Sequence, residues 1–279
     1  MKRISIVLSA IFLSSLSLWA QSAQESSSSL RLNWGMGKIK TQDLIYTPVL
    51  HEEWSPFNLA VTYSHSHRLV HRVYVKLSRY TPSVVEPYTF YWDTPDELST
   101  TGTHQFNILD LNYSLGRPVL SGNKLSLVLG AGSRNRLHQS SYGYGPDWLS
   151  HFGYYFSFGL DIWSQMSCAI GNSSRLSMNL ALPLFAYITR SPYMGQNDDY
   201  FENAFSHKPI PTLMAYIKDG EFQSWGQSKS LDFDLSYEYG ISEKWSLGAT
   251  YWLSMNFNSY PVPFRSVEQI ISLSATFNF

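Results

Sequence analysis

The sequence is poor in charged residues and has no excess of either sign. Asp, Glu, Lys and Arg make up 15% of the 279 residues, against about 25% in soluble domains. The formal net charge is -1, without the basic excess that nucleic-acid-binding proteins usually carry. We therefore expect no nucleic acid among its partners.

Cysteine and long apolar runs are also scarce. Cys168 is the single cysteine, which excludes a disulfide within the chain. Beyond the N-terminal segment, no apolar run reaches the ~20 residues that a membrane-spanning helix needs, and the mean hydropathy is -0.18. The composition excludes a bundle of membrane helices.

Aromatic residues are abundant, at 16% of the chain. So many aromatic residues indicate that the folded protein has a large apolar surface in contact with other apolar groups, although its mean hydropathy is low. A transmembrane β-barrel satisfies both observations, because only every second residue of each strand has to face lipid.

The N-terminus has the features of a secretory signal. Lys2 and Arg3 precede an apolar stretch over 4–18, and small residues follow at Ala20, Ser22 and Ala23. This pattern is typical of a cleaved signal peptide. We expect residues 1–23 to be removed on export and residues 24–279 to form one domain.

Strict alternation of apolar and polar residues dominates the rest of the chain, as in half-buried strands. Alternating stretches run over 30–36, 57–63, 73–77, 109–115, 125–131, 156–162, 176–182, 231–239, 245–253 and 271–279. Long connections, such as 38–56 and 135–154, alternate with short ones, such as 65–70 and 240–244. The pattern predicts an all-β fold: a single antiparallel transmembrane barrel of about ten strands with short periplasmic turns and long external loops. Twelve strands would result if part of 188–228 paired at the rim.

A soluble β-sandwich or lipocalin-like barrel is the alternative fold, and the polar face of the strands decides between them. Ser246, Gly248 and Thr250 on one strand are small, whereas a solvated face would normally carry Lys and Glu. Small polar residues suit the crowded lumen of a narrow barrel.

The C-terminal stretch Ile271–Phe279 alternates apolar residues and ends on an aromatic residue. It resembles the C-terminal strand of bacterial outer-membrane β-barrel proteins. The resemblance implies that Phe277 and Phe279 form the signal read by the barrel assembly machinery. It also implies that the protein lies in the outer membrane of a Gram-negative bacterium, in contact with outer-membrane lipid.

The polar face carries charges of both signs in near balance. A narrow lumen with little water favours pairing of such charges, so we expect an ion-pair network that fills the interior and blocks solutes. Its predicted members are Arg31, Arg72, Lys76, Arg134, Asp110, Asp161, Asp232, Asp234 and Glu238.

His138 and Ser140 resemble the His-x-Ser pair of outer-membrane phospholipases and lipid A deacylases. The resemblance implies a histidine base that activates a serine nucleophile. Here, however, both residues lie an even number of positions from Arg134, so they have its lumen parity: the alternation along the strand points all three side chains into the lumen. In addition, no acidic or amide residue follows at a similar spacing. We predict that the pair is not catalytic.

Two further clusters invite a chemical interpretation. Asp232 and Asp234 resemble the paired carboxylates of the omptin proteases, but no Asp-x-His partner occurs in the sequence. His65, His67 and His71 surround the first short turn without a carboxylate or cysteine within the cluster. We therefore predict a structural role for the carboxylates, no metal site and no cofactor.

The predicted external loops are rich in aromatic residues, which are common at binding surfaces. They include Tyr80, Tyr88, Phe90, Tyr91, Trp92, Tyr142, Tyr144, Trp148, Tyr193, Tyr200, Phe201 and Phe205. They either contact a glycan or a protein, or pack together over the barrel mouth.

The sequence favours a barrel with a structural, surface-binding or limited permeability role and no demonstrable catalytic site. The alternatives are an outer-membrane lipid hydrolase using Ser140 and His138, and a narrow channel for a small solute. The position of that pair and the occlusion of the lumen discriminate between them.

Overall fold

The computed structural model describes residues 27–84, 86–91, 98–122, 124–144, 151–191, 214, 217–218 and 220–279. The predicted signal peptide and the loop aromatics Trp92, Trp148, Tyr193, Tyr200, Phe201 and Phe205 lie outside these residues. The strands are β1 (Ser27–Asp43), β2 (His51–Ser66), β3 (Val70–Tyr80), β4 (Thr89–Tyr91), β5 (Leu98–Thr100), β6 (Gln105–Ser121), β7 (Leu125–Tyr142), β8 (His151–Ile170), β9 (Ser174–Arg190), β10 (Glu221–Gln223), β11 (Ser228–Gly240), β12 (Trp245–Asn258) and β13 (Phe264–Asn278).

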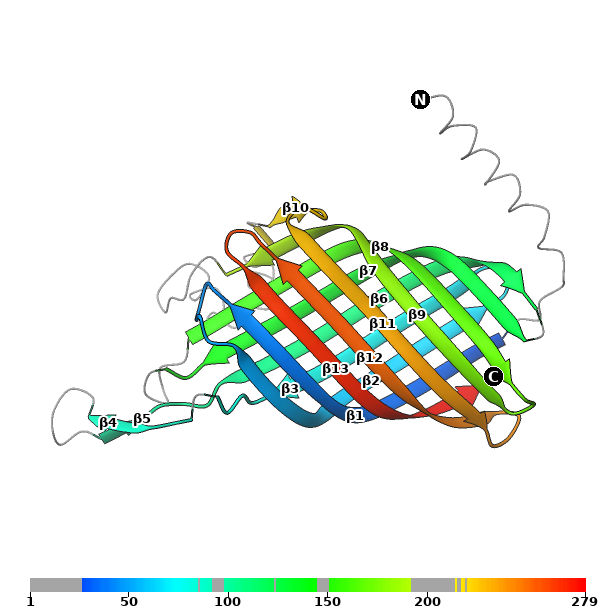
Figure 1. Cartoon of the computed structure of the whole chain (residues 1–279), viewed down its shortest axis with the longest axis horizontal. Coiled ribbons are helices and arrows are strands. Elements are labelled where there is room, and N and C mark those ends of the chain that lie inside the picture. The colour runs from blue at the N-terminus through cyan, green and yellow to red at the C-terminus, as the bar shows by residue number, and fades with distance from the viewer. Residues whose placement is uncertain are drawn as a thin grey trace, which may run out of the picture.

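The long strands form one closed antiparallel barrel (Figure 1). Around the ring the order is β9, β11, β12, β13, β1, β2, β3, β6, β7 and β8, and pairing of β8 with β9 closes it. The short β10 pairs with β9 at the rim, while β4 and β5 form a separate hairpin that projects from one end. This confirms the predicted all-β fold and its ten-strand barrel.

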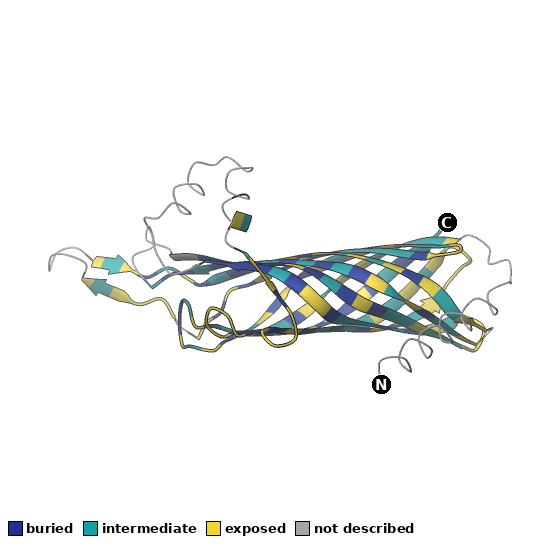
Figure 2. Cartoon of the chain, turned by 90° about the horizontal axis from the view of Figure 1, so that it is seen from above, coloured by how far each residue is buried: buried dark blue, intermediate teal, exposed yellow. Residues whose placement is uncertain are grey.

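Burial alternates along each strand, so exposed and buried residues appear as a chequered pattern on the barrel wall (Figure 2). On β1, Leu32, Trp34 and Met36 are more than half exposed, whereas Asn33 between them faces the lumen. Apolar residues thus point outward and small polar residues inward, as predicted. Within the described residues, no helix has the length and apolar character to cross a membrane.

The strands extend beyond the apolar belt at one end of the barrel, here called the loop end; the opposite end, with tight turns, is the turn end. Above Met36, the outward residues of β1 are Lys38 and Lys40, and both pair with Glu52 of β2. The predicted loop over 38–56 was therefore too long, since residues 44–50 connect these strands. At the loop end the outward residues are polar, so the apolar pattern of the lipid-facing side stops there. The strands nevertheless remain paired through their backbone hydrogen bonds.

A bulge in β9 changes which residues face the lumen. Leu160 of β8 pairs with Phe185, while Asp161 pairs with Pro183, which leaves Leu184 as an extra residue. Leu184 and Phe185 are consequently both exposed, and the parity of β9 reverses beyond them.

Trp163 is a large aromatic residue whose side chain points into the lumen. Its side chain is 1% exposed and packs inside the barrel with Val70 and Val128. It has the parity of Asp161, whose side chain also faces the lumen.

Candidate functional site

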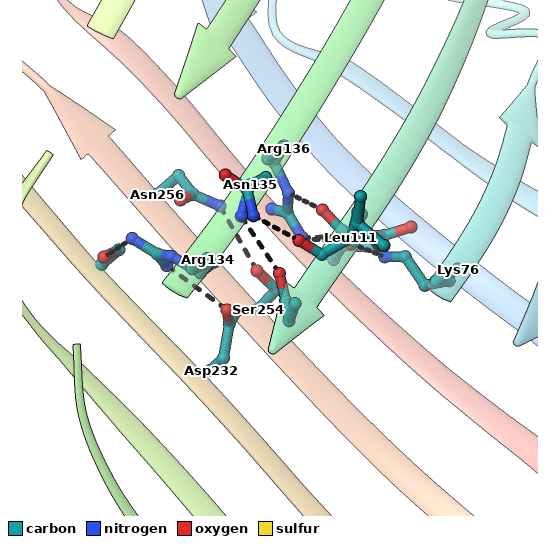
Figure 3. A network of polar contacts seen from close by, with 12 residues as sticks. Lys76, Leu111, Arg134, Asn135, Arg136, Asp232, Ser254 and Asn256 are labelled. Atoms are coloured by element: carbon teal, nitrogen blue, oxygen red, sulfur yellow. Dashed lines mark hydrogen bonds and ion pairs between the residues drawn. The ribbon is translucent and has the colours of Figure 1, made fainter. Parts of the chain in front are cut away.

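The lumen contains a central layer of buried charges (Figure 3). The Nζ atom of Lys76 lies 2.8 Å from Asp110 and 2.5 Å from Glu268. Arg136 makes two hydrogen bonds to Asp110, at 2.5 and 2.8 Å, and Tyr80 donates its hydroxyl to Glu268 at 2.9 Å. The ammonium of Lys76 also lies 3.5 Å from the ring centroid of Trp252.

Three further groups of ion pairs lie towards the turn end. Arg134 contacts Asp161 and Asp232 at 3.4 and 3.3 Å. Arg72 contacts Asp234 at 3.0 Å, and Arg31 contacts Glu238 at 2.7 Å. The structure therefore places all nine residues of the predicted network in ion pairs.

Sequence reasoning missed two members of the central layer and one pair at the loop end. Arg136 and Glu268 have the lumen parity of Arg134 and Ser272, so extending the alternation would have found both. Arg190 pairs with Asp43 at 2.6 Å. If the alternation in the first half of β9 continued unbroken, Arg190 would point outward. The bulge shifts this alternation by one residue and therefore turns Arg190 into the lumen.

Some of these contacts span the full width of the ring. β7, which carries Arg136, and β13, which carries Glu268, have four strands between them on either side. These residues approach to 3.8 Å. Arg72 on β3 and Asp234 on β11 are likewise on opposite strands of the ring. Side chains from opposite walls therefore meet in the middle of the lumen.

Two cavities lie in this part of the barrel, with volumes of about 30 and 40 Å³. Arg72, Tyr74, Asp234 and Trp252 line both of them. A water molecule needs roughly 10–15 Å³ of such volume, so each cavity has room for a few waters.

An aromatic and histidine cluster lies above the central layer, at the loop end. His51 and His104 are fully buried, with ring centroids 5.3 Å apart, and His51 packs against Phe106 and Tyr142 at 5.3 and 5.6 Å. Burial lowers the pKa of His51 to about 4, assisted by His104, and burial lowers the pKa of His104. Burial therefore favours the neutral form of both imidazoles.

His138 and Ser140 both face the lumen and are 2% and 7% exposed. The imidazole of His138 packs against Phe106 and Phe264, with centroids 5.5 and 6.0 Å away. Its Nε2 atom has no hydrogen-bond partner among the described residues. The pair thus lies inside the barrel, away from the lipid face.

Asp232 and Asp234 are each engaged by a different arginine, as given above, and Asn179 also donates to Asp234 at 2.8 Å. No histidine contact to either carboxylate is found within the described part of the chain. This arrangement neutralises both carboxylates and does not prepare them to share a proton.

The C-terminal aromatics lie at the turn end on the outer wall. Phe277 contacts Trp245 and Phe279, with centroid distances of 5.0 and 5.8 Å, and Phe279 stacks on Tyr63 at 6.4 Å. Phe279 remains 63% exposed. In the described residues, no group of three or more His, Cys, Asp or Glu is arranged to hold a metal ion.

The shape of the barrel resembles that of known membrane proteins. The outer-membrane protease OmpT from Escherichia coli superposes with a TM-score of 0.58 over 95% of this chain and 100% of its own, at 6% identity. This is an outer-membrane β-barrel fold. The translocator domain of NalP from Neisseria meningitidis gives a TM-score of 0.41 over 99% of this chain and 96% of its own, at 8% identity. No protein-family model and no curated protein sequence matches the chain.

Proposed function

We propose that the protein is a non-conducting outer-membrane barrel with a structural and surface-binding role. In this proposal residues 1–23 direct export and are removed, the turn end faces the periplasm and the loop end faces outward. Phe277 and Phe279 present the assembly signal to the barrel assembly machinery, and the apolar belt contacts outer-membrane lipid.

The observation that carries the proposal is the contact across the full lumen between Arg136 and Glu268, with Lys76 and Asp110 between their strands. A solute could pass only if these ion pairs separated. Each buried charge would then lose its partner in a space too small for full hydration, which is strongly unfavourable. The two cavities are consistent with occlusion, because the ion-paired side chains of Arg72 and Asp234 line both of them.

Two alternatives have less support from the geometry. A lipid hydrolase needs its nucleophile at the lipid face, whereas Ser140 and His138 are buried inside the lumen. A solute channel needs a continuous polar path, whereas the central layer crosses the lumen.

The hairpin of β4 and β5 supports the surface-binding part of the proposal. It projects beyond the loop end (Figure 1), and Tyr88, Tyr91 and Leu98 in or beside it are 56%, 63% and 63% exposed. Exposed aromatic groups of this kind favour contact with a glycan or a protein. Binding of the folded barrel to an array of glycans should weaken when Tyr88 and Tyr91 are changed to Ser.

Liposome swelling tests the permeability part of the proposal. Liposomes that contain the unmodified barrel should swell in small sugars or amino acids no faster than protein-free liposomes. Rapid swelling by the unmodified protein would contradict the occluded lumen, and the surface-binding role would then have to be judged separately.

A further inference from the structure

One row of outward-facing residues crosses four strands at the turn end. Ser28 of β1 is directly opposite His65 of β2, which is opposite His71 of β3, which is opposite Leu115 of β6. Side chains that are directly opposite on antiparallel strands have Cβ atoms about 4.5–5.5 Å apart. The two imidazole rings accordingly lie with centroids 6.2 Å apart and an interplanar angle of 43°.

Each of these histidines has one ring nitrogen engaged and one available. The Nδ1 atom of His65 is 2.9 Å from the Ser28 hydroxyl, and the Nδ1 atom of His71 is 2.9 Å from the Tyr113 hydroxyl. A hydroxyl can accept a hydrogen bond from Nδ1–H, which leaves the lone pair on Nε2. Neither Nε2 atom has a hydrogen-bond partner among the described residues.

This arrangement matches the surroundings of metal-binding histidines, whose second ring nitrogen is usually held by a hydrogen bond that fixes the tautomer and the ring orientation. The sequence alone predicted no metal site at this turn, but the ring contact and the two supporting hydrogen bonds change that expectation. We propose that His65 and His71 bind a divalent transition-metal ion of the Cu²⁺ or Zn²⁺ class through their Nε2 atoms. Imidazole nitrogen suits these ions, and Cu²⁺ binds most strongly in the divalent series.

The spacing of the rings is compatible with a shared ion. With metal–nitrogen distances of about 2.0–2.1 Å, two ring centroids lie roughly 5 Å apart around a tetrahedral ion and roughly 6 Å apart when the two nitrogens are nearly opposite each other across the ion. The observed separation of 6.2 Å is at the upper limit, so a tetrahedral ion requires a side-chain rotation that brings the rings about 1 Å closer. Both side chains are half-buried on the outer wall, so water can fill the remaining coordination positions.

His67 lies in the turn between β2 and β3 and provides a matched control. Its backbone N–H donates to the carbonyl oxygen of Leu69 at 3.1 Å, and its side chain is exposed. The proposed ion joins β2 to β3 through His65 and His71 and does not need this third imidazole.

Copper binding to the folded barrel in detergent micelles, prepared without a histidine tag, tests the proposal. Electron paramagnetic resonance of one bound Cu²⁺ should show coupling to two imidazole nitrogens. His65→Asn and His71→Asn should each weaken Cu²⁺ binding at least tenfold in a chelator competition, whereas His67→Asn should change it less than twofold.

The supporting hydrogen bond gives a second test that retains both ligands. Tyr113→Phe should weaken Cu²⁺ binding by about tenfold, because loss of a supporting partner typically costs 10–100-fold in metal affinity. Coupling to a single nitrogen would overturn the proposal. So would unchanged affinity in the His65 and His71 variants, or a loss in His67→Asn equal to theirs.

Discussion

Lys76→Met removes one of the two cations of the central layer, Lys76 and Arg136, and should destabilise the barrel strongly. Lys76 is 1% exposed and Glu268 is 0% exposed, so this change leaves a buried carboxylate. Glu268 keeps the Tyr80 hydroxyl at 2.9 Å and Arg136 at 3.8 Å, while Asp110 keeps both hydrogen bonds from Arg136. Breaking a buried pair costs about 3–5 kcal/mol, and since partial compensation remains we expect about 3 kcal/mol.

A double change distinguishes an ion-pair effect from a packing effect. Lys76→Met with Glu268→Met removes both partners and should be more stable than Lys76→Met alone by about 2 kcal/mol, because no orphaned charge remains. Lys124→Met, at an exposed turn position, is the matched control and should change stability by less than about 0.5 kcal/mol. Equilibrium urea unfolding in liposomes, followed by tryptophan fluorescence, measures all three. If Lys76→Met cost no more than the control, or if the two changes were simply additive, the reasoning would be refuted.

Three other predictions concern the outer wall, the loop end and the His-x-Ser pair. Leu273 is 71% exposed on the outer wall. Leu273→Phe should leave the free energy of unfolding nearly unchanged, whereas Leu273→Arg should lower it by about 2–4 kcal/mol if the residue lies near the bilayer midplane. Equal stability of the two variants in liposomes would show that this face does not contact lipid. Because the pKa of His51 falls to about 4 on folding, the unfolded chain binds more protons below the ordinary pKa of 6.5. For His51, stability should therefore fall by about 2 kcal/mol between pH 6.5 and pH 4, allowing for screening. The lowered pKa of His104 acts in the same direction, and the raised pKa of Asp43 acts in the opposite direction. Unfolding curves at several pH values should show that His51→Phe removes the His51 part of this pH dependence. Purified protein in mixed micelles should release no fatty acid from phospholipid or lipid A, and turnover that disappears in Ser140→Ala would make the protein an enzyme.

The alternation of side chains was sufficient to predict the barrel and to assign part of the charged residues to its lumen. Arg72, Lys76 and Asp110 were assigned to the interior from parity alone, because a strand has a period of two and reverses its faces only at a bulge. The pairing of particular charges was beyond the sequence, since contacts such as that between Arg72 and Asp234 depend on the ring order and the stagger of the strands.

Local irregularities limited the rest of the prediction. The bulge beside Leu184 turns Arg190 into the lumen, and no residue pattern in β9 announces it apart from Pro183. The strands also continue beyond the lipid belt, where Lys38 and Lys40 replace apolar residues. Alternation there no longer separates apolar from polar side chains, so the hydrophobic pattern underestimates the strand length.

Single-channel recording in planar bilayers tests the occluded lumen most directly. The unmodified barrel should give no stable conductance of porin size, because ion pairs join opposite walls of the ring. Arg72→Ser combined with Arg136→Ser removes the cations of both pairs that span the ring and should produce discrete openings, whereas Lys124→Ser should behave like the unmodified protein. Stable porin-sized conductance from the unmodified barrel would contradict an occluded lumen.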